Sequence, residues 1–191
     1  MKELKSLVAV LTCGDDTRAE AAAGFLAPYG QEAVDLLRPL LDDPDPDHRW
    51  WAIRGLAGIQ SPQVTPLLTQ ALSDADLGVR QCAALALRHQ PDLQALPALI
   101  ETLSSPDSLM AHLAADALVA IGTPAVPELM RLMENSSRAA RLEAVRALAL
   151  IADPQTIPTL YNLFSEDSSL MEYWANEGLE RMGVGMVYFN P

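Results

Sequence analysis

The stretch that decides the fold is RWWAIRGL, residues 49–56. It places alanine three residues after arginine, a small residue at the sixth place and a large apolar residue at the seventh. The same motif recurs in steps of 30 or 31 residues, and a fixed period of this length is typical of a solenoid built from stacked repeats. Its six copies are Arg18-Ala21-Gly24-Phe25, Arg49-Ala52-Gly55-Leu56, Arg80-Ala83-Ala86-Leu87, Ala111-Ala114-Ala117-Leu118, Arg141-Ala144-Ala147-Leu148 and Glu172-Ala175-Gly178-Leu179.

Each repeat divides into two helical stretches. The motif belongs to the second stretch, where Ala52, Leu56 and Ile59 have the spacing of one helix face. The first stretch begins with a proline motif such as Val126-Pro127-Glu128-Leu129, and proline is tolerated in the first turn of a helix. We therefore predict an all-α fold, an α-solenoid of about six antiparallel helix pairs in a single domain, 1–191. The expected pairs are 2–28, 31–59, 62–89, 92–121, 124–151 and 154–182. The tail 183–191 is expected to be a C-terminal cap, and the alternative is a segment that docks a partner.

Charge and cysteine content limit the partners of the chain. It has 25 acidic against 13 basic residues, a net charge of -12, so nucleic acids and anionic membranes should repel most of its surface. Cys13 and Cys82 form no CxxC pair, which favours a reducing compartment. The first residues do not resemble a signal peptide, and no apolar run approaches the roughly 20 residues that span a bilayer. We expect a cytoplasmic protein, with neither nucleic acid nor membrane as a partner.

The sequence shows no pattern of catalytic or metal-binding residues. Asp43, Asp45 and Asp47 imitate the opening of an EF-hand calcium loop, but the required glycine and glutamate positions hold His48 and Arg54. We therefore expect these aspartates to cap a helix. The three histidines lack zinc-site spacing, and no glycine-rich phosphate loop occurs. No catalytic residue, metal or cofactor is predicted.

The paired helices, the proline motif and the Asp-Pro-Asp turn before Arg-x-x-Ala resemble the HEAT repeat family, and more closely its short HEAT-like repeats of the phycobilisome lyase type. The resemblance covers nearly the whole chain. It implies a right-handed superhelix, and it implies a concave side lined by residues one, five and eight places after the first motif residue. Those positions form the predicted partner-binding groove: Trp50, Arg54, Gln81, Arg88, His112, Asp116, Arg146, Tyr173 and Glu177.

An exposed aromatic residue beside arginine is the composition of binding hot spots, which favours Trp50 and Arg54 as contact residues. Adjacent tryptophans on a helix point about 100° apart, so Trp50 and Trp51 do not face the same core. We predict that Trp51 and Trp174 pack between repeats. The alanine substitutions Trp50→Ala and Arg54→Ala are expected to leave the melting temperature nearly unchanged.

The recurring arginines of the motif allow two interpretations. They are a ladder for an acidic partner, or they hold the stack together by reaching the acidic turns. The aspartate-rich turns immediately upstream favour the second interpretation for this set, which comprises Arg18, Arg49, Arg80 and Arg141.

The leading functional hypothesis is a non-catalytic scaffold or adaptor that presents a concave helical surface to a protein or peptide and is itself a monomer. The alternative, which only the resemblance implies, is a phycobilin lyase-like protein or a chaperone that handles phycobiliproteins. If the chain is an enzyme, a bilin lyase-like activity is expected. A third class, the DNA glycosylases built from HEAT-like repeats, uses a basic groove, which disagrees with the acidic composition.

Overall fold

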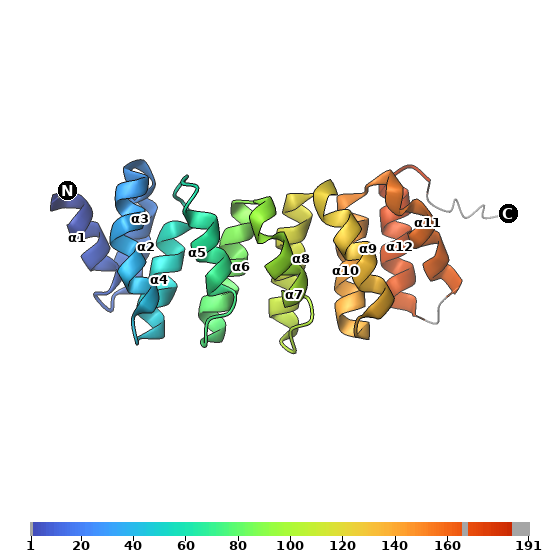
Figure 1. Ribbon diagram of the computed structural model, residues 1–191, viewed down its shortest axis with the longest axis horizontal. Helices are drawn as coiled ribbons and strands as arrows, with labels where there is room; N and C mark the ends of the chain where they lie inside the picture. The colour runs from blue at the N-terminus through green and yellow to red at the C-terminus, as the bar shows by residue number, and fades with distance from the viewer. Residues whose placement is uncertain (1, 166–167, 185–191) are drawn as a thin grey trace. The chain divides into compact units, whose positions relative to one another are not determined.

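The computed structural model describes residues 2–165 and 168–184. Within these residues every regular element is helical: there are twelve α-helices, six short 3-10 helices and no strand. Figure 1 labels the α-helices in chain order. They belong to two compact units, Met1–Ala95 and Leu96–Pro191. The predicted all-α fold is confirmed. The single domain and the right-handed superhelix remain predictions, and the tail beyond Val184 lies outside the described residues.

Unit 1 contains three helix pairs, and in each pair we call the first helix A and the second B. The A helices are α1 (Lys2–Leu11), α3 (Gln31–Leu37) and α5 (Val64–Ala71). The B helices are α2 (Asp16–Gly24), α4 (Pro46–Leu56) and α6 (Leu77–His89). The 3-10 helices are η1 (Ala27–Tyr29), η2 (Arg38–Asp42) and η3 (Leu93–Ala95).

Unit 2 repeats the arrangement. Its A helices are α7 (Leu96–Thr102), α9 (Val126–Asn135) and α11 (Ile157–Asn162). Its B helices are α8 (Ser108–Ile121), α10 (Arg138–Ile151) and α12 (Ser169–Arg181). The 3-10 helices are η4 (Thr123–Ala125), η5 (Pro154–Thr156) and η6 (Leu163–Ser165).

Aspartates in the turns begin the B helices. Asp76 accepts a hydrogen bond from the backbone N–H of Val79, and Asp107 accepts one from Met110. In the turn before α4, the Asp43 side chain accepts a hydrogen bond from the backbone N–H of Asp45. The Asp45 side chain accepts one from the backbone N–H of Asp47. Each such cap satisfies a donor that the helix itself cannot pair. The acidic turn therefore caps a helix, as predicted.

The alanines and leucines of the motif form the core of both units. Ala52, Leu56 and Ile59 are fully buried in unit 1, as are Ala144 and Leu148 in unit 2. The small sixth residue allows close packing: a Cβ at Gly178 would lie 2.8 Å from Ala149 Cα. Alanine and leucine thus fill the core, and the small residue sets the distance between neighbouring B helices.

The first copy of the motif was placed one residue out of register. Phe25, predicted to be the large core residue, is 65% exposed, whereas Leu26 is fully buried. Ala22 and Ala23 are buried and Ala21 is exposed. The cause is a run of nearly identical small residues, which does not indicate which side of α2 faces the core.

Two arginines of the motif bind the aspartate-containing turns, which confirms the structural interpretation for Arg49 and Arg80. Arg49 donates two hydrogen bonds to the Asp74 carboxylate, at 2.9 and 2.8 Å, and another to the Asp43 carbonyl at 2.9 Å. Arg80 donates to the Asp74 carbonyl at 2.6 Å. Arg49 thereby joins its own turn to the turn of the next repeat.

The Arg49–Asp74 pair predicts a specific response to acid. The hydrogen bonds from Arg49 hold the pKa of Asp74 below its ordinary value, so Asp74 remains charged at lower pH in the folded protein than in the unfolded one. Its stabilisation is therefore complete above the unfolded pKa, about 3.9, and is lost as the pH falls through the lower folded value. We expect Asp74→Asn to cost about 2 kcal/mol at pH 7 and progressively less below about pH 4. Urea unfolding between pH 7 and pH 3 measures this.

Asp42→Asn is the control, because it removes the same charge from an exposed side chain at the end of η2. If the difference in the free energy of unfolding between wild type and Asp74→Asn stays constant down to pH 3, the Arg49–Asp74 pair does not cause the acid response.

Candidate functional site

The B helices of unit 1 present a mixed apolar and charged surface, which we call the unit 1 face. It consists of Glu20 from α2, Trp50 and Arg54 from α4, and Gln81, Leu85 and Arg88 from α6. On α4 and α6, spacings of three or four residues place these side chains on one helix face. Trp50 and Trp51 are half-buried, and their rings meet edge to face with centroids 4.7 Å apart. This contact fixes the orientation of Trp50.

Arg54 is held by an acidic residue of the preceding repeat. Its Nε donates to a Glu20 carboxylate oxygen at 3.0 Å, and its Nη2 contacts the other oxygen. The sequence did not reveal Glu20 because the first motif copy was out of register. In the corrected register, Glu20 has the same position in the first repeat as Trp50 has in the second. The Arg54–Glu20 ion pair therefore joins the adjacent B helices α2 and α4.

Leu85 is the second residue that the sequence did not indicate. It lies on α6 four residues after Gln81 and three before Arg88, and it is 39% exposed. Gln81 is half-buried and Arg88 exposed. Leu85 occupies the same repeat position as Arg54, and this equivalence is the sequence signal that identifies it. The face therefore combines Trp50 and Leu85 with two arginines.

The B helices of unit 2 hold a buried charged cluster. Arg146 on α10 is only 7% exposed. It donates to Asp116 at 2.9 Å, to Glu143 at 2.8 Å and to the His112 carbonyl at 3.0 Å, so it connects α8 and α10. His112 Nδ1 also lies 3.4 Å from the Glu143 carboxylate. The structure thus brings together three predicted groove residues and adds Glu143, but it occupies Arg146 with internal partners.

The last B helix carries the remaining predicted residues. Tyr173 on α12 is 58% exposed, and its ring meets that of half-buried Trp174 edge to face at 5.1 Å. Glu177 accepts a hydrogen bond from Arg181 at 2.9 Å. Tyr173 therefore offers an exposed aromatic surface, whereas Glu177 is engaged within its own helix.

The cysteines differ in environment. Cys82 lies behind the unit 1 face, and burial raises the pKa of its thiol to about 12, so it is protonated at neutral pH. Cys13 is exposed. Among residues 2–165 and 168–184, no three His, Cys, Asp or Glu side chains are grouped so as to hold a metal ion. Over the same ranges, no helix has the length and apolar character needed to cross a membrane.

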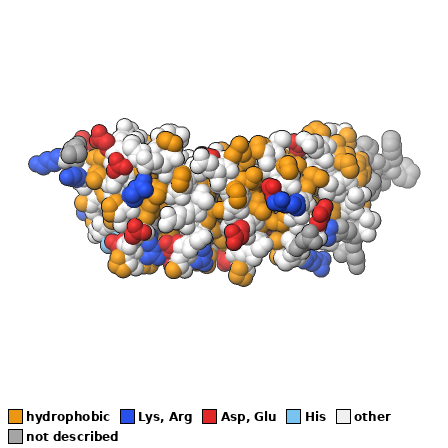
Figure 2. Space-filling model, in the orientation of Figure 1, with side chains coloured by type: hydrophobic (Ala, Val, Ile, Leu, Met, Phe, Trp, Pro, Cys, Tyr) orange, Lys and Arg blue, Asp and Glu red, His pale blue; other side chains and the backbone are white. Residues whose placement is uncertain are grey.

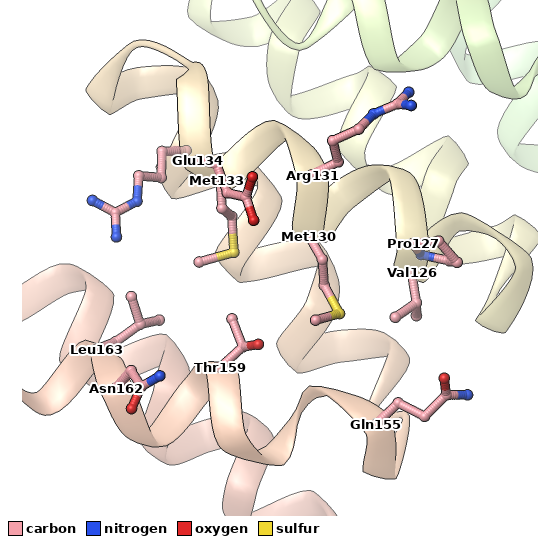
Figure 3. A pocket seen from close by; sticks show the side chains of 11 residues that line it. Val126, Pro127, Met130, Arg131, Met133, Glu134, Gln155, Thr159, Asn162 and Leu163 are labelled. Carbon is pink, nitrogen blue, oxygen red and sulfur yellow. The ribbon is translucent and has the colours of Figure 1, made fainter.

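A cavity of about 630 Å³ lies between α9 and α11 in unit 2 (Figure 3). Met130 and Met133 point from α9 toward α11, while Thr159 and Leu163 point back from the opposite wall. The sequence did not indicate this cavity, because the methionines have the spacing of core residues. The complete lining is Val126, Pro127, Met130, Arg131, Met133, Glu134, Arg141, Gln155, Thr159, Asn162 and Leu163.

Charges are interspersed on the side of the molecule that Figure 2 shows. Basic and acidic side chains are mixed with one another and with hydrophobic ones, and the described residues on this side form no large field of one sign. Such a surface differs from the continuous basic groove that a nucleic-acid binder uses.

Comparison with known proteins decides the family. A model of HEAT repeats matches residues 4–88, 34–118, 65–135 and 96–180. The chain belongs to the HEAT repeat family. The resemblance seen in the sequence is therefore confirmed, and the helix pairs described above are HEAT repeats.

Two similar proteins are a phycocyanobilin lyase subunit and a phycobilisome maturation protein. The chain is 35% identical over 109 residues to a phycocyanobilin lyase subunit beta from Pseudanabaena tenuis, covering 54% of this chain and 37% of the relative. It is 34% identical over 101 residues to a phycobilisome maturation protein from Synechococcus elongatus, covering 53% and 48%. The chain thus spans less than half the length of either relative.

A solved structure shows a similar fold. It is the complex of CpcE and CpcF of phycocyanin lyase from Nostoc, which matches with a TM-score of 0.60 and 23% identity, covering 76% of this chain and 98% of that chain. At this identity the likeness concerns the fold alone.

The half-burial of Trp50 changes the expected cost of its removal. The sequence predicted almost no effect, whereas the edge-to-face contact with Trp51 and the partial burial lead us to expect Trp50→Ala to cost about 1–2 kcal/mol. Tyr173→Ala is the control, since it removes a similar edge-to-face pair from a more exposed side chain, and should cost less than about 1 kcal/mol. Chemical denaturation measures both. A loss above about 4 kcal/mol for Trp50→Ala would identify Trp50 as a core residue and not a surface one.

Proposed function

We propose that this chain is a HEAT-repeat protein of the phycobilin lyase type, which handles phycobiliproteins and their chromophores together with a protein partner. The observation that carries the proposal is the 34–35% identity, over more than half of the chain, to a phycocyanobilin lyase subunit and to a phycobilisome maturation protein. This favours the lyase-type alternative over a general scaffold. The proposal includes a cytoplasmic location and a monomer that binds its partner there.

The unit 1 face is the proposed contact surface for the protein partner. Trp50 and Leu85 offer apolar area, and Arg88 is an exposed base. Arg54 is already oriented by Glu20, so less side-chain entropy is lost when a partner carboxylate approaches. Aromatic and arginine side chains of this kind dominate binding energy at protein interfaces.

In unit 2 the proposed contacts come from exposed Tyr173 and from His112, whose side chain is 45% exposed. Asp116, Arg146 and Glu177 contribute by fixing the shape of this surface, because their charges are used in internal pairs. A rigid surface binds with a smaller entropy cost.

A non-catalytic scaffold is the second candidate. It is favoured by the internal pairing of the charged side chains, such as Arg54 with Glu20 and Arg146 with Asp116, which leaves them oriented for recognition. Cys82 supports the same interpretation, because a buried protonated thiol is a poor nucleophile.

A chromophore-attachment assay separates the two candidates. The chain is mixed with an apo-phycocyanin subunit and phycocyanobilin, with and without a second lyase-type HEAT chain, and covalent pigment is measured on denaturing gels. A lyase-type handler changes the yield or rate of correct attachment. A scaffold binds the subunit and leaves both unchanged, and that result would refute the lyase-type proposal.

A further inference from the structure

The A helix α11 carries an apolar face made of Ile157, Tyr161 and Phe164, which we call the α11 face. Spacings of four and three residues place the three side chains on one side of the helix. The ring centroids of Tyr161 and Phe164 lie 6.3 Å apart. Ile157 and Phe164 are half-buried, and Tyr161 is 42% exposed. One aliphatic and two aromatic side chains are therefore gathered where water can reach them.

The equivalent face of α9 is turned toward the A helix that follows it. The residues 31 places before the α11 face are Val126, Met130 and Met133. All three line the cavity between α9 and α11, and both methionines point toward α11 (Figure 3). One repeat earlier still, Ile100 lines the groove between α7 and α9. This face of an A helix thus meets the next A helix, and none follows α11 among the described residues.

The turn after α12 leads the chain toward the α11 face. The B helices of unit 2 are each followed by a residue with positive φ at equivalent positions, which are Gly122 (80°), Ala152 (53°) and Gly183 (74°). After the first two of these turns the chain enters the next A helix, α9 or α11. After the third, Val184 is held at α11, because the Tyr161 hydroxyl donates to its carbonyl at 2.7 Å. The residues that follow therefore start beside the α11 face.

Residues 185–191 lie outside the described residues, and their sequence is Gly-Met-Val-Tyr-Phe-Asn-Pro. Counted by the repeat of 31, they take the place that η5 and the start of α11 take in the preceding repeat. None is charged, and four are large apolar or aromatic residues, Met186, Val187, Tyr188 and Phe189. Seven extended residues span up to about 23 Å, whereas a six-residue helix such as α11 is about 9 Å long. The segment is thus long enough and apolar enough to cover the α11 face.

We propose that residues 185–191 dock on the α11 face, at the place where internal repeats have the next A helix. Burial of apolar surface drives the contact, since docking removes Tyr161 and Phe164 from water. The hydrogen bond between Tyr161 and Val184 fixes where the segment begins and reduces the entropy lost on docking. The docked segment closes this side of unit 2, as the terminal repeats of a solenoid require. A HEAT repeat of another chain then cannot stack on α11.

Cysteine labelling at the α11 face tests this placement. Ile157→Cys is introduced into a chain whose exposed Cys13 is changed to serine, while Cys82 is buried. The rate of reaction with a maleimide is measured with the native segment 185–191 and with its four large side chains replaced by serine. We expect the serine replacement to speed labelling at position 157 at least about tenfold, because the cover over the α11 face is lost.

Leu170→Cys is the matched control. Leu170 is a 58% exposed apolar residue of α12 that does not belong to the α11 face, so its labelling should change by less than about twofold. Phe164→Cys takes the place of Ile157→Cys if that variant does not fold. Equal labelling rates with the native and the serine segment would overturn the proposal. Protection that grows with protein concentration would also overturn it, because a second copy would then be the occupant. The attachment assay tests the lyase-type function independently of these rates.

Discussion

Arg146→Ala is expected to lower the free energy of unfolding by about 3–5 kcal/mol, because it leaves two carboxylates in a poorly hydrated place without their cation. The Arg146 side chain is 8% exposed, and those of Asp116 and Glu143 are 19% exposed. Removal of the guanidinium also takes away the hydrogen bond to the His112 carbonyl and one of the links between α8 and α10. Urea unfolding at pH 7 measures the loss.

Arg54→Ala is the matched control. Arg54 occupies the same repeat position and also pairs with a carboxylate of the preceding B helix, but its side chain is 37% exposed and that of Glu20 50%. Exposed pairs contribute little, so this variant should cost less than about 1 kcal/mol. Equal losses for the two variants would show that burial of Arg146 does not determine its contribution.

Gly178→Ala is expected to cost about 1–3 kcal/mol, since an added methyl group overpacks a tight helix contact. The new Cβ would lie 2.8 Å from Ala149 Cα and 2.9 Å from Leu160 Cδ1. The contact with Ala149 involves backbone, so α12 has to move away from α10. Thermal or chemical unfolding records the change.

Gly24→Ala is the control, because Gly24 was assigned to the same place in the motif but has no atom within 4 Å of its added Cβ. Gly24 ends helix α2, where alanine has a higher helix propensity, so the variant should be neutral or more stable by up to about 1 kcal/mol. A destabilisation similar to that of Gly178→Ala would contradict the register correction in the first repeat.

The fold was predictable because the repeat period determines which residues are equivalent. Ala52, Leu56 and Ile59 repeat the spacing of Ala144 and Leu148, and the structure buries all five. The prediction failed only where the equivalence was ambiguous. In α2, small residues stand on both sides of the helix, and the large residue chosen for the core, Phe25, is exposed.

The candidate site was less predictable, because exposure depends on partners in neighbouring repeats. Tyr173 has the exposure expected of a contact residue, whereas Arg146 is buried by Asp116, one repeat away. Opposite charges at the same position of consecutive repeats were a usable signal for that pair. The cavity at Met130 had no such signal, because it depends on how far α9 and α11 stand apart.

The most direct measurement for the proposed function is the binding of the intact chain to an apo-phycocyanin subunit, by calorimetry or size-exclusion chromatography, with wild type, Trp50→Ala and Tyr161→Ala. Tyr161 is an exposed aromatic on an A helix of unit 2, is not part of the unit 1 face, and serves as the control. We predict that wild type binds, that Trp50→Ala weakens binding at least about tenfold, and that Tyr161→Ala does not. No binding by wild type, or an equal loss in both variants, would contradict the assignment of the unit 1 face to a phycobiliprotein partner.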